Sequence, residues 1–218
     1  KKSCLTNSIL SQLCCLINNI FKGQGGFAKT WIVSFFFLID KTEGGYRPIA
    51  VDNILVRLFG KCISKLRSVE IGDKLKSLQL GVGISGGCEF IAHTVSNWGT
   101  EIIQNPFSDN VIIKIDISNA FNSISREAIK DGIMRYCPYL LSYFLWAYGD
   151  ATDLVLINGK VIGQSSSGVR QGDPLGPIFF SLGFHGPLLD TKEAFPDVDL
   201  MAYLDDGVFH SNITRAIE

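Results

Sequence analysis

Residues 168–177 read Gly-Val-Arg-Gln-Gly-Asp-Pro-Leu-Gly-Pro, and the interpretation of the chain starts from this stretch. Its glycines permit tight backbone conformations that other residues avoid. Asp173 followed by Pro174 is the order of a helix cap and a first-turn proline, which predicts a helix from here to about Leu189. The stretch is therefore expected to be a tight turn that opens into a helix.

A second short stretch, Tyr203-Leu204-Asp205-Asp206, follows that helix. The flanking segments 200–204 and 207–210 are apolar, which predicts a β-hairpin with both aspartates in its turn. Adjacent carboxylates repel each other, and a bound cation relieves that repulsion. Asp also favours turns that bind no metal. Taken alone, the pair favours an ordinary turn over a metal site.

A third carboxylate, Asp116, ends the apolar run Val111–Ile115. This pattern predicts a buried strand that delivers a carboxylate at its tip. The simpler alternative is that Asp116 caps the segment that follows, and in isolation the cap is favoured. Ser125 is predicted to cap a further helix that runs to about Tyr136.

The rest of the chain alternates in the same way between helical and extended patterns. Asn158-Gly159 is a strong hairpin signal between the segments 154–157 and 160–162. The run Trp31–Ile39 is too short to span a bilayer and is predicted to be a buried strand. Further helices are expected over 5–21, 54–69, 89–98 and 138–149, and a further hairpin pairs 31–40 with 46–51.

Composition limits the class of protein. The 218 residues are 46% hydrophobic and 19% charged, which is typical of a globular chain. Residues 1–70 hold 10 of the 20 Lys and Arg residues but only 4 of the 21 acidic residues. A basic first part therefore precedes an acidic second part, a distribution that chance explains equally well.

The six cysteines show no spacing that would fix zinc, and no secretory signal precedes them. They are expected to be reduced core residues of an intracellular protein. The sequence does not distinguish nucleus from cytoplasm.

A strand ending in Asp116, the turn at 168–177 and the stretch 203–206 occur here in the order found in reverse transcriptases, and the sequence resembles that family. Tyr46-Arg47-Pro48-Ile49 and Gln79-Leu80-Gly81 are similar to its finger motifs. The resemblance runs from about residue 39 to residue 210. The sequence of the turn is similar to that of non-LTR retrotransposon and group II intron enzymes. At the position of Leu204, those enzymes carry Ala more often than Leu.

The resemblance implies an α+β fold, the fingers and palm of a right-hand polymerase with an antiparallel palm sheet. Asn105-Pro106 is the expected boundary between fingers that lead into the palm (1–105) and an incomplete palm (106–218). The thumb would belong to further polypeptide. No membrane partner is expected.

The implied activity is RNA-directed DNA synthesis, in which dNTPs extend a DNA primer on an RNA template. Two Mg²⁺ ions, with Mn²⁺ as the alternative, would be held by the catalytic residues Asp116, Asp205 and Asp206 and by the backbone carbonyl of Ile117. The residues implied to bind the incoming nucleotide are Lys41, Arg47, Ser118, Asn119, Ala120, Phe121, Gln171 and Gly172.

Phe121, five residues after Asp116, is implied to exclude a ribose 2′-hydroxyl. Lys61, Lys65 and Arg67, expected on one helical face, and Tyr203 are implied to contact nucleic acid. Two plain alternatives remain at these positions: Phe121 as a core residue, and the basic face as a solvated surface. At the level of the whole chain, the alternatives are a catalytically inactive nucleic-acid-binding remnant and an RNA-dependent RNA polymerase.

Overall fold

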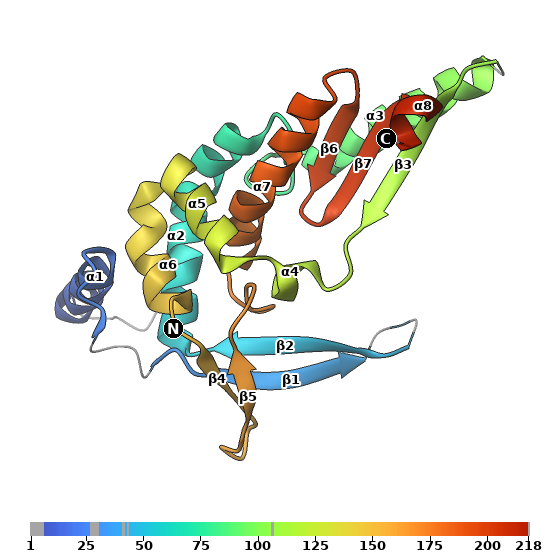
Figure 1. Ribbon diagram of the computed structural model, residues 1–218. Helices are drawn as coiled ribbons and strands as arrows, with labels where there is room; N and C mark the ends of the chain where they lie inside the picture. The colour runs from blue at the N-terminus through green and yellow to red at the C-terminus, as the bar shows by residue number, and fades with distance from the viewer. Residues whose placement is uncertain (1–6, 27–30, 41, 43, 106, 218) are drawn as a thin grey trace, which may run out of the picture.

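The computed structural model describes residues 7–26, 31–40, 42, 44–105 and 107–217 (Figure 1). Two sheets and a group of helices make up the fold. In chain order the elements are α1 (Asn7–Phe21), β1 (Ser34–Asp40), β2 (Tyr46–Asp52), α2 (Ile54–Leu75), α3 (Gly87–Gln104), β3 (Asn110–Asp116), α4 (Ala120–Ser123), α5 (Arg126–Tyr136), the 3₁₀ turn η2 (Pro138–Leu140), α6 (Leu141–Tyr148), β4 (Thr152–Val155), β5 (Val161–Ser165), α7 (Gly176–Ala194), β6 (Asp199–Tyr203), β7 (Asp206–Asn212) and α8 (Ile213–Ile217).

The first sheet has the strand order β2-β1-β4-β5. The predicted hairpin of β1 and β2 is confirmed, with Phe36 opposite Ala50. β4 then pairs with β1 in parallel through Ser34 and Phe35. This sheet combines strands from both sides of residue 105, and pairing so distant in sequence could not be read from local patterns.

The second sheet has the order β3-β7-β6, and both of its pairings are antiparallel. Figure 1 shows the end of β3 and the β6–β7 turn directed towards the β1–β2 hairpin, with α4 between them. The antiparallel sheet expected for the palm is therefore present. Strand β3 was predicted to be buried, but its residues are exposed or half-buried.

Helix α7 is the centre of the core, since nine of its 19 residues are buried, all but one of them between Gly176 and His185. It packs against α5, where Gly132 allows the backbone of α5 to approach the carbonyl oxygen of Leu182. His185 of α7 is buried, with its ring edge-on to Tyr136 at 5.3 Å. Burial lowers the pKa of the His185 imidazole, and the positive charge of Arg135 lowers it further.

Several local signals in the sequence are confirmed. Ser125 caps α5, because its side chain accepts a hydrogen bond from the Ala128 amide at 3.3 Å. Gly159 has a positive φ of 81° in the β4–β5 connection, as the Asn-Gly signal predicted. Asp173 accepts a hydrogen bond from the Leu175 amide at 2.9 Å, but α7 begins at Gly176 with Leu175 as its N-cap, so the cap predicted at Asp173 is wrong by two residues.

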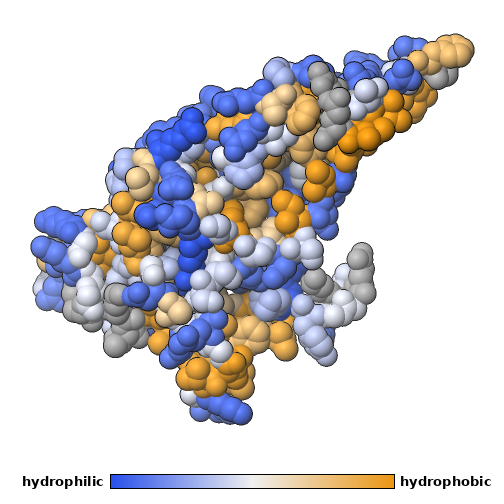
Figure 2. Space-filling view, viewed as in Figure 1, coloured by the Kyte–Doolittle hydropathy of each residue, from blue (hydrophilic) through white to orange (hydrophobic). Residues whose placement is uncertain are grey.

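Two further predictions about burial are wrong. Strand β1 is not buried: Phe35 and Phe37 are 43% and 42% exposed, because nothing among the described residues covers that face of the sheet. Figure 2 shows hydrophobic side chains at the surface of this lower part of the molecule. Of the five cysteines that the structure describes, only Cys137 is buried. Within the same residues, no helix has the length and apolar character to cross a membrane.

Candidate active site

Asp116 and Asp206 lie directly opposite each other in the β3–β7 ladder. Residues in that position have Cβ atoms about 4.5–5.5 Å apart, and like charges there destabilise the sheet. Asp116 is exposed and the Asp206 side chain is 50% exposed, so both carboxylates are open to solvent. The structure thus brings together two acidic residues that are 90 positions apart in the chain.

Asp205 lies beside this pair, in the turn between β6 and β7. The turn residues are Leu204 and Asp205, whereas Asp206 is the first residue of β7. The prediction that both aspartates occupy the turn is therefore wrong by one residue. Leu204 has a positive φ of 56°, a conformation that costs energy for a residue with a branched side chain.

The donor set fits a divalent cation, because carboxylate oxygens are the ligands that Mg²⁺ prefers. In the structure, Lys114 provides positive charge instead: its Nζ lies 3.2 Å from Oδ1 of Asp206, and both side chains are at least half exposed. No group of three acidic, His or Cys side chains is already arranged around a metal position within the described residues. The strand register supplies the pairing of carboxylates, and the side chains would have to turn to share an ion.

The segment after Asp116 bends sharply into α4. Asn119 adopts a positive φ of 55°, and the carbonyl oxygen of Ile117 accepts a hydrogen bond from the Ala120 amide at 3.3 Å. Ser118 and Asn119 are exposed and Ala120 is buried. The Phe121 ring is half-buried and stacked on Phe180 at 4.6 Å, so one of its faces belongs to the core.

The turn at 168–177 is fixed from both sides. The amide of Val169 donates to the carbonyl oxygen of Phe121 at 2.7 Å, which attaches the turn to α4. A Cβ on Gly172 would lie 2.4 Å from the carbonyl oxygen of Ala50, so only glycine allows this approach. Gly172, which the resemblance implies to bind the incoming nucleotide, lies in this structure against the backbone of β2.

Arg170 joins this turn to the first sheet through a buried ion pair. Its Nε lies 2.9 Å from Oδ1 of Asp52 without the alignment of a hydrogen bond, and the two side chains are 1% and 0% exposed. The Ser34 hydroxyl donates to the same carboxylate oxygen. The guanidinium also lies over the Tyr148 ring at 4.1 Å.

Tyr148 extends this network to the start of α7, since its hydroxyl donates to Oδ2 of Asp173 at 2.5 Å. Burial raises the pKa of the Asp173 carboxyl, and the positive charge of Arg170 opposes that rise. The motif that most strongly suggested the family is therefore mainly a buried structural junction that joins the start of α7 to the first sheet. No local sequence pattern indicates that Asp52 pairs with Arg170.

Gln171 faces a hollow of about 210 Å³ between the first sheet and the turn. The residues that line it are Phe36, Pro48, Ala50, Asn122, Leu154, Gln164, Ser165, Ser166, Ser167, Arg170 and Gln171. Arg47 is exposed on β2, opposite Ile39. Lys41 lies outside the described residues.

The three basic residues of α2 do not form a uniform surface. Lys61 and Lys65 are exposed, and the described residues offer neither of them an ion pair. Arg67 instead pairs with Glu70 at 2.8 Å and lies over the Tyr139 ring at 5.0 Å. Because it turns towards Tyr139, Arg67 does not share the face of the two lysines. Tyr203 is 36% exposed at the end of β6.

Comparison with solved structures identifies the same fold in telomerases. The chain matches a telomerase from Candida albicans in complex with a fragment of telomeric RNA at a TM-score of 0.62 and 13% identity, over 85% of this chain and 39% of that one. It also matches an apo telomerase from Candida tropicalis at a TM-score of 0.61 and 13% identity, over 97% of this chain and 44% of that one. At such low identity these matches concern the fold alone.

Sequence comparison finds curated relatives among retrotransposon proteins. The chain is 30% identical to the retrotransposable element SLACS 132 kDa protein of Trypanosoma brucei gambiense, over 78% of this chain and 14% of the relative. It is 32% identical to the Pol polyprotein of the type-2 retrotransposable element R2DM of Drosophila melanogaster, over 65% of this chain and 14% of the relative. The chain thus spans about one seventh of the length of these relatives.

The family model described as reverse transcriptase (RNA-dependent DNA polymerase) matches residues 39–218. This range contains both sheets except for the first residues of β1, and it includes Asp116, Asp205, Asp206 and the turn at 168–177. The chain therefore belongs to the reverse transcriptase family, as a domain whose relatives are proteins of non-LTR retrotransposons.

Proposed function

We propose that this domain extends a DNA primer with dNTPs on an RNA template, with Asp116, Asp205 and Asp206 as its catalytic carboxylates. The observation that carries the proposal is the register of β3 and β7, which sets Asp116 opposite Asp206 and beside the turn that holds Asp205. A sheet tolerates such like charges more readily when a cation occupies the site.

Two divalent ions, Mg²⁺ or Mn²⁺, would activate the primer 3′-hydroxyl and neutralise charge on the triphosphate. In this proposal Asp116 and Asp205 are the principal ligands, and Asp206 holds the ion on the primer side. The Ile117 carbonyl oxygen keeps a second lone pair beside its bond to Ala120, so it remains able to act as a ligand.

The remaining assignments concern the incoming nucleotide. Gln171 would lie against the new base pair, and the hollow that it faces supports this role. Arg47, Lys41 and the amides of residues 118–121 would hold the triphosphate. Phe121 would face the sugar with the side of its ring that is not stacked on Phe180.

The wider context is also part of the proposal. Residues 1–105 and 106–218 would act as fingers and palm, with β4 and β5 as strands that the second part contributes to the fingers sheet. Lys61, Lys65, Arg67 and Tyr203 would contact nucleic acid. The intracellular location stays a prediction.

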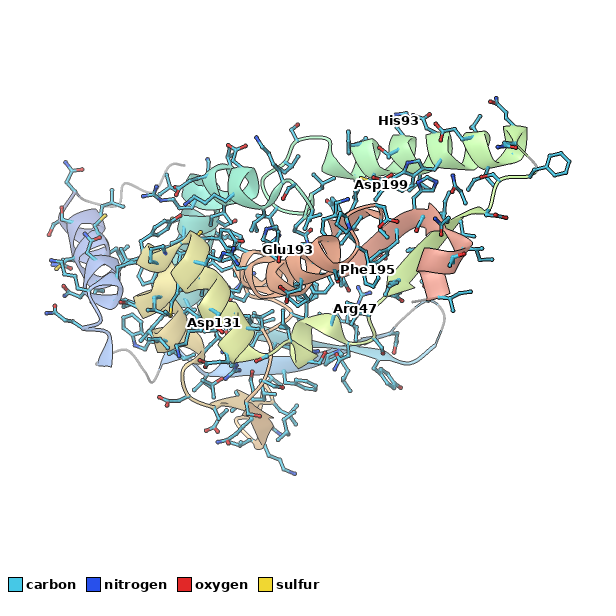
Figure 3. All side chains as sticks on the ribbon, turned by 45° about the horizontal axis from the view of Figure 1, so that its top comes forward. Arg47, His93, Asp131, Glu193, Phe195 and Asp199 are labelled. Carbon is cyan, nitrogen blue, oxygen red and sulfur yellow. The ribbon has the colours of Figure 1, made fainter. Side chains whose placement is uncertain are left out.

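The proposal is tested by RNA-templated primer extension with the protein as its gene encodes it. Asp205→Asn should abolish extension and leave template affinity within about threefold, because it removes charge at the metal site and no contact to the template. Asp131→Asn is the matched control, since Asp131 is an exposed residue of α5 (Figure 3). Template binding without extension by the unaltered protein would instead support the inactive, binding-only alternative.

A further inference from the structure

Gln79 lies between α2 and α3, in a segment that the proposed function leaves without a role. Its side chain is fully buried, although it carries a polar amide and belongs to no helix or strand. A buried amide costs free energy unless its hydrogen-bonding groups find partners. The partners of Gln79 are 125 residues away in the chain, at the β6–β7 turn.

The amide of Gln79 binds both backbone groups of Leu204. The Leu204 amide donates to Oε1 of Gln79 at 2.7 Å, and Nε2 of Gln79 donates to the Leu204 carbonyl oxygen at 3.0 Å. Oε1 also accepts a hydrogen bond from the Gly81 amide at 3.0 Å, which fixes the orientation of the side chain. The side chain thus bonds to Leu204 as a neighbouring strand would.

Leu204 is the residue that most needs such support. It has a positive φ of 56° and immediately precedes Asp205. A leucine holds this conformation only when its surroundings stabilise it. The direction in which the Asp205 carboxylate leaves the turn depends on the backbone of Leu204.

The backbone around Gln79 strengthens the contact. The Leu80 amide donates to the Ala202 carbonyl oxygen at 2.8 Å, and the Ala202 amide donates to the Leu78 carbonyl oxygen at 2.7 Å. Residues 78–80 therefore extend the edge of β6 as a short parallel bridge. These backbone bonds attach the segment 78–80 to β6, so the Gln79 side chain has a fixed position beside the β6–β7 turn.

Gly81 limits the same turn from the other side. A Cβ at this position would lie 2.6 Å from the Leu204 amide nitrogen and 2.8 Å from Leu204 Cγ. The φ of Gly81 is not positive, so an alanine here would be excluded by this contact and not by its own backbone conformation. Gln79 and Gly81 thus define one narrow space for Leu204.

We propose that Gln79 is a positioning residue that sets the conformation of Leu204, and through it the place of the Asp205 carboxylate, with Gly81 as the opposing wall. This inference rests on the proposed function for its catalytic consequence. Its structural part, the attachment of the turn to Gln79, does not depend on that function.

Two variants test the proposal independently, in the protein as its gene encodes it. Gln79→Met keeps the side-chain volume and removes all three hydrogen bonds. Gly81→Ala keeps Gln79 and displaces Leu204 by steric contact. Gly99→Ala is the matched control for the second variant, because a Cβ on Gly99 of α3 meets nothing within 4 Å.

We expect both variants to lower kcat for primer extension about ten- to a hundredfold, since small displacements of catalytic groups cost this much. KM for dNTP and the Kd for primer–template should stay within about threefold, because neither residue contacts them in this account. Hydrogen exchange of the peptide that contains residues 200–207 should become faster in both variants. Gly99→Ala should change none of these quantities.

The proposal is overturned if exchange at residues 200–207 is unchanged in both variants, or if kcat falls only in parallel with primer–template binding. If thermal unfolding shows that Gln79→Met does not fold, Gly81→Ala alone decides between these outcomes. If the unaltered protein extends no primer, the proposed function fails, and hydrogen exchange still tests the attachment of the turn.

Discussion

The buried ion pair of Arg170 and Asp52 tests how the turn at 168–177 is joined to the first sheet. Replacing Arg170 with Met keeps much of the apolar stem and removes the charge. Asp52 would then stay buried at 3% exposure, with the Ser34 hydroxyl as its remaining partner. Removing one partner of a buried ion pair costs about 3–5 kcal/mol, because the other charge is left without compensation.

Other contacts of Arg170 place the expected loss within the upper part of that range. Its Nη1 donates to the Ala147 carbonyl oxygen at 3.1 Å and to the Thr152 hydroxyl at 3.3 Å, and both bonds would disappear. We therefore expect Arg170→Met to lower the free energy of unfolding by about 4–5 kcal/mol. Urea denaturation of the 218-residue chain, followed by tryptophan fluorescence, measures this loss.

A double variant separates the charge pair from the packing. Oδ2 of Asp52 and Nη2 of Arg170 are both buried without a hydrogen-bond partner among the described residues, so the pair itself is incompletely satisfied. Replacing both residues, as Asp52→Leu with Arg170→Met, should recover most of the lost stability. Arg135→Met is the control, with an expected loss of at most about 1 kcal/mol from its contact with a tyrosine ring. A loss below about 1 kcal/mol for Arg170→Met, or strictly additive effects in the double variant, would refute the reasoning.

Three further predictions follow from single side chains. Phe121→Val should raise the ratio of rNTP to dNTP incorporation about ten- to a hundredfold, and an unchanged ratio would make Phe121 a core residue only. Lys61→Ala should reduce the slope of log K for template binding against log salt concentration by the contribution of about one phosphate contact. Arg67→Ala should reduce that slope less, because Arg67 already pairs with an acidic residue. Equal effects of the two variants would contradict this. Since the pKa of His185 is lowered in the folded chain, the unfolded chain takes up a proton first as the pH falls below about 6.5, and the free energy of unfolding should decrease there. His185→Gln should flatten that decrease and His93→Gln, on the exposed side of α3 (Figure 3), should not; a profile unchanged by His185→Gln would refute the assignment.

Local chemistry explains which parts of the fold were predictable. Ser125 and Asn158-Gly159 act on their own backbone within a few residues, and each predicted its cap or turn correctly. Asp173-Pro174 predicted the start of α7 to within three residues, since the helix begins at Gly176. The periodic spacing of apolar residues predicted the positions of most of the helices and strands. The short helices α4 and α8 were not predicted, because four or five residues are too few to show a helical spacing of apolar residues.

Contacts between distant segments explain the failures. The parallel pairing of β1 with β4, the Arg170–Asp52 pair and the bonds of Gln79 to the turn all join residues more than 100 positions apart. Nothing in the local sequence of Gln79 distinguishes it from an exposed glutamine. The buried character predicted for β1 failed for a related reason, since burial depends on what covers a face and not on the strand alone.

The central claim is that β3 and the β6–β7 turn together hold divalent ions for nucleotidyl transfer. The most direct measurement is anomalous diffraction from Mn²⁺ in crystals of the protein bound to primer–template and an incoming dNTP. The account predicts an anomalous peak within ligand distance of a carboxylate oxygen of Asp116 and of one from Asp205 or Asp206. Mn²⁺ bound only away from these residues, or an ordered dNTP with no ion beside Asp116, would contradict it.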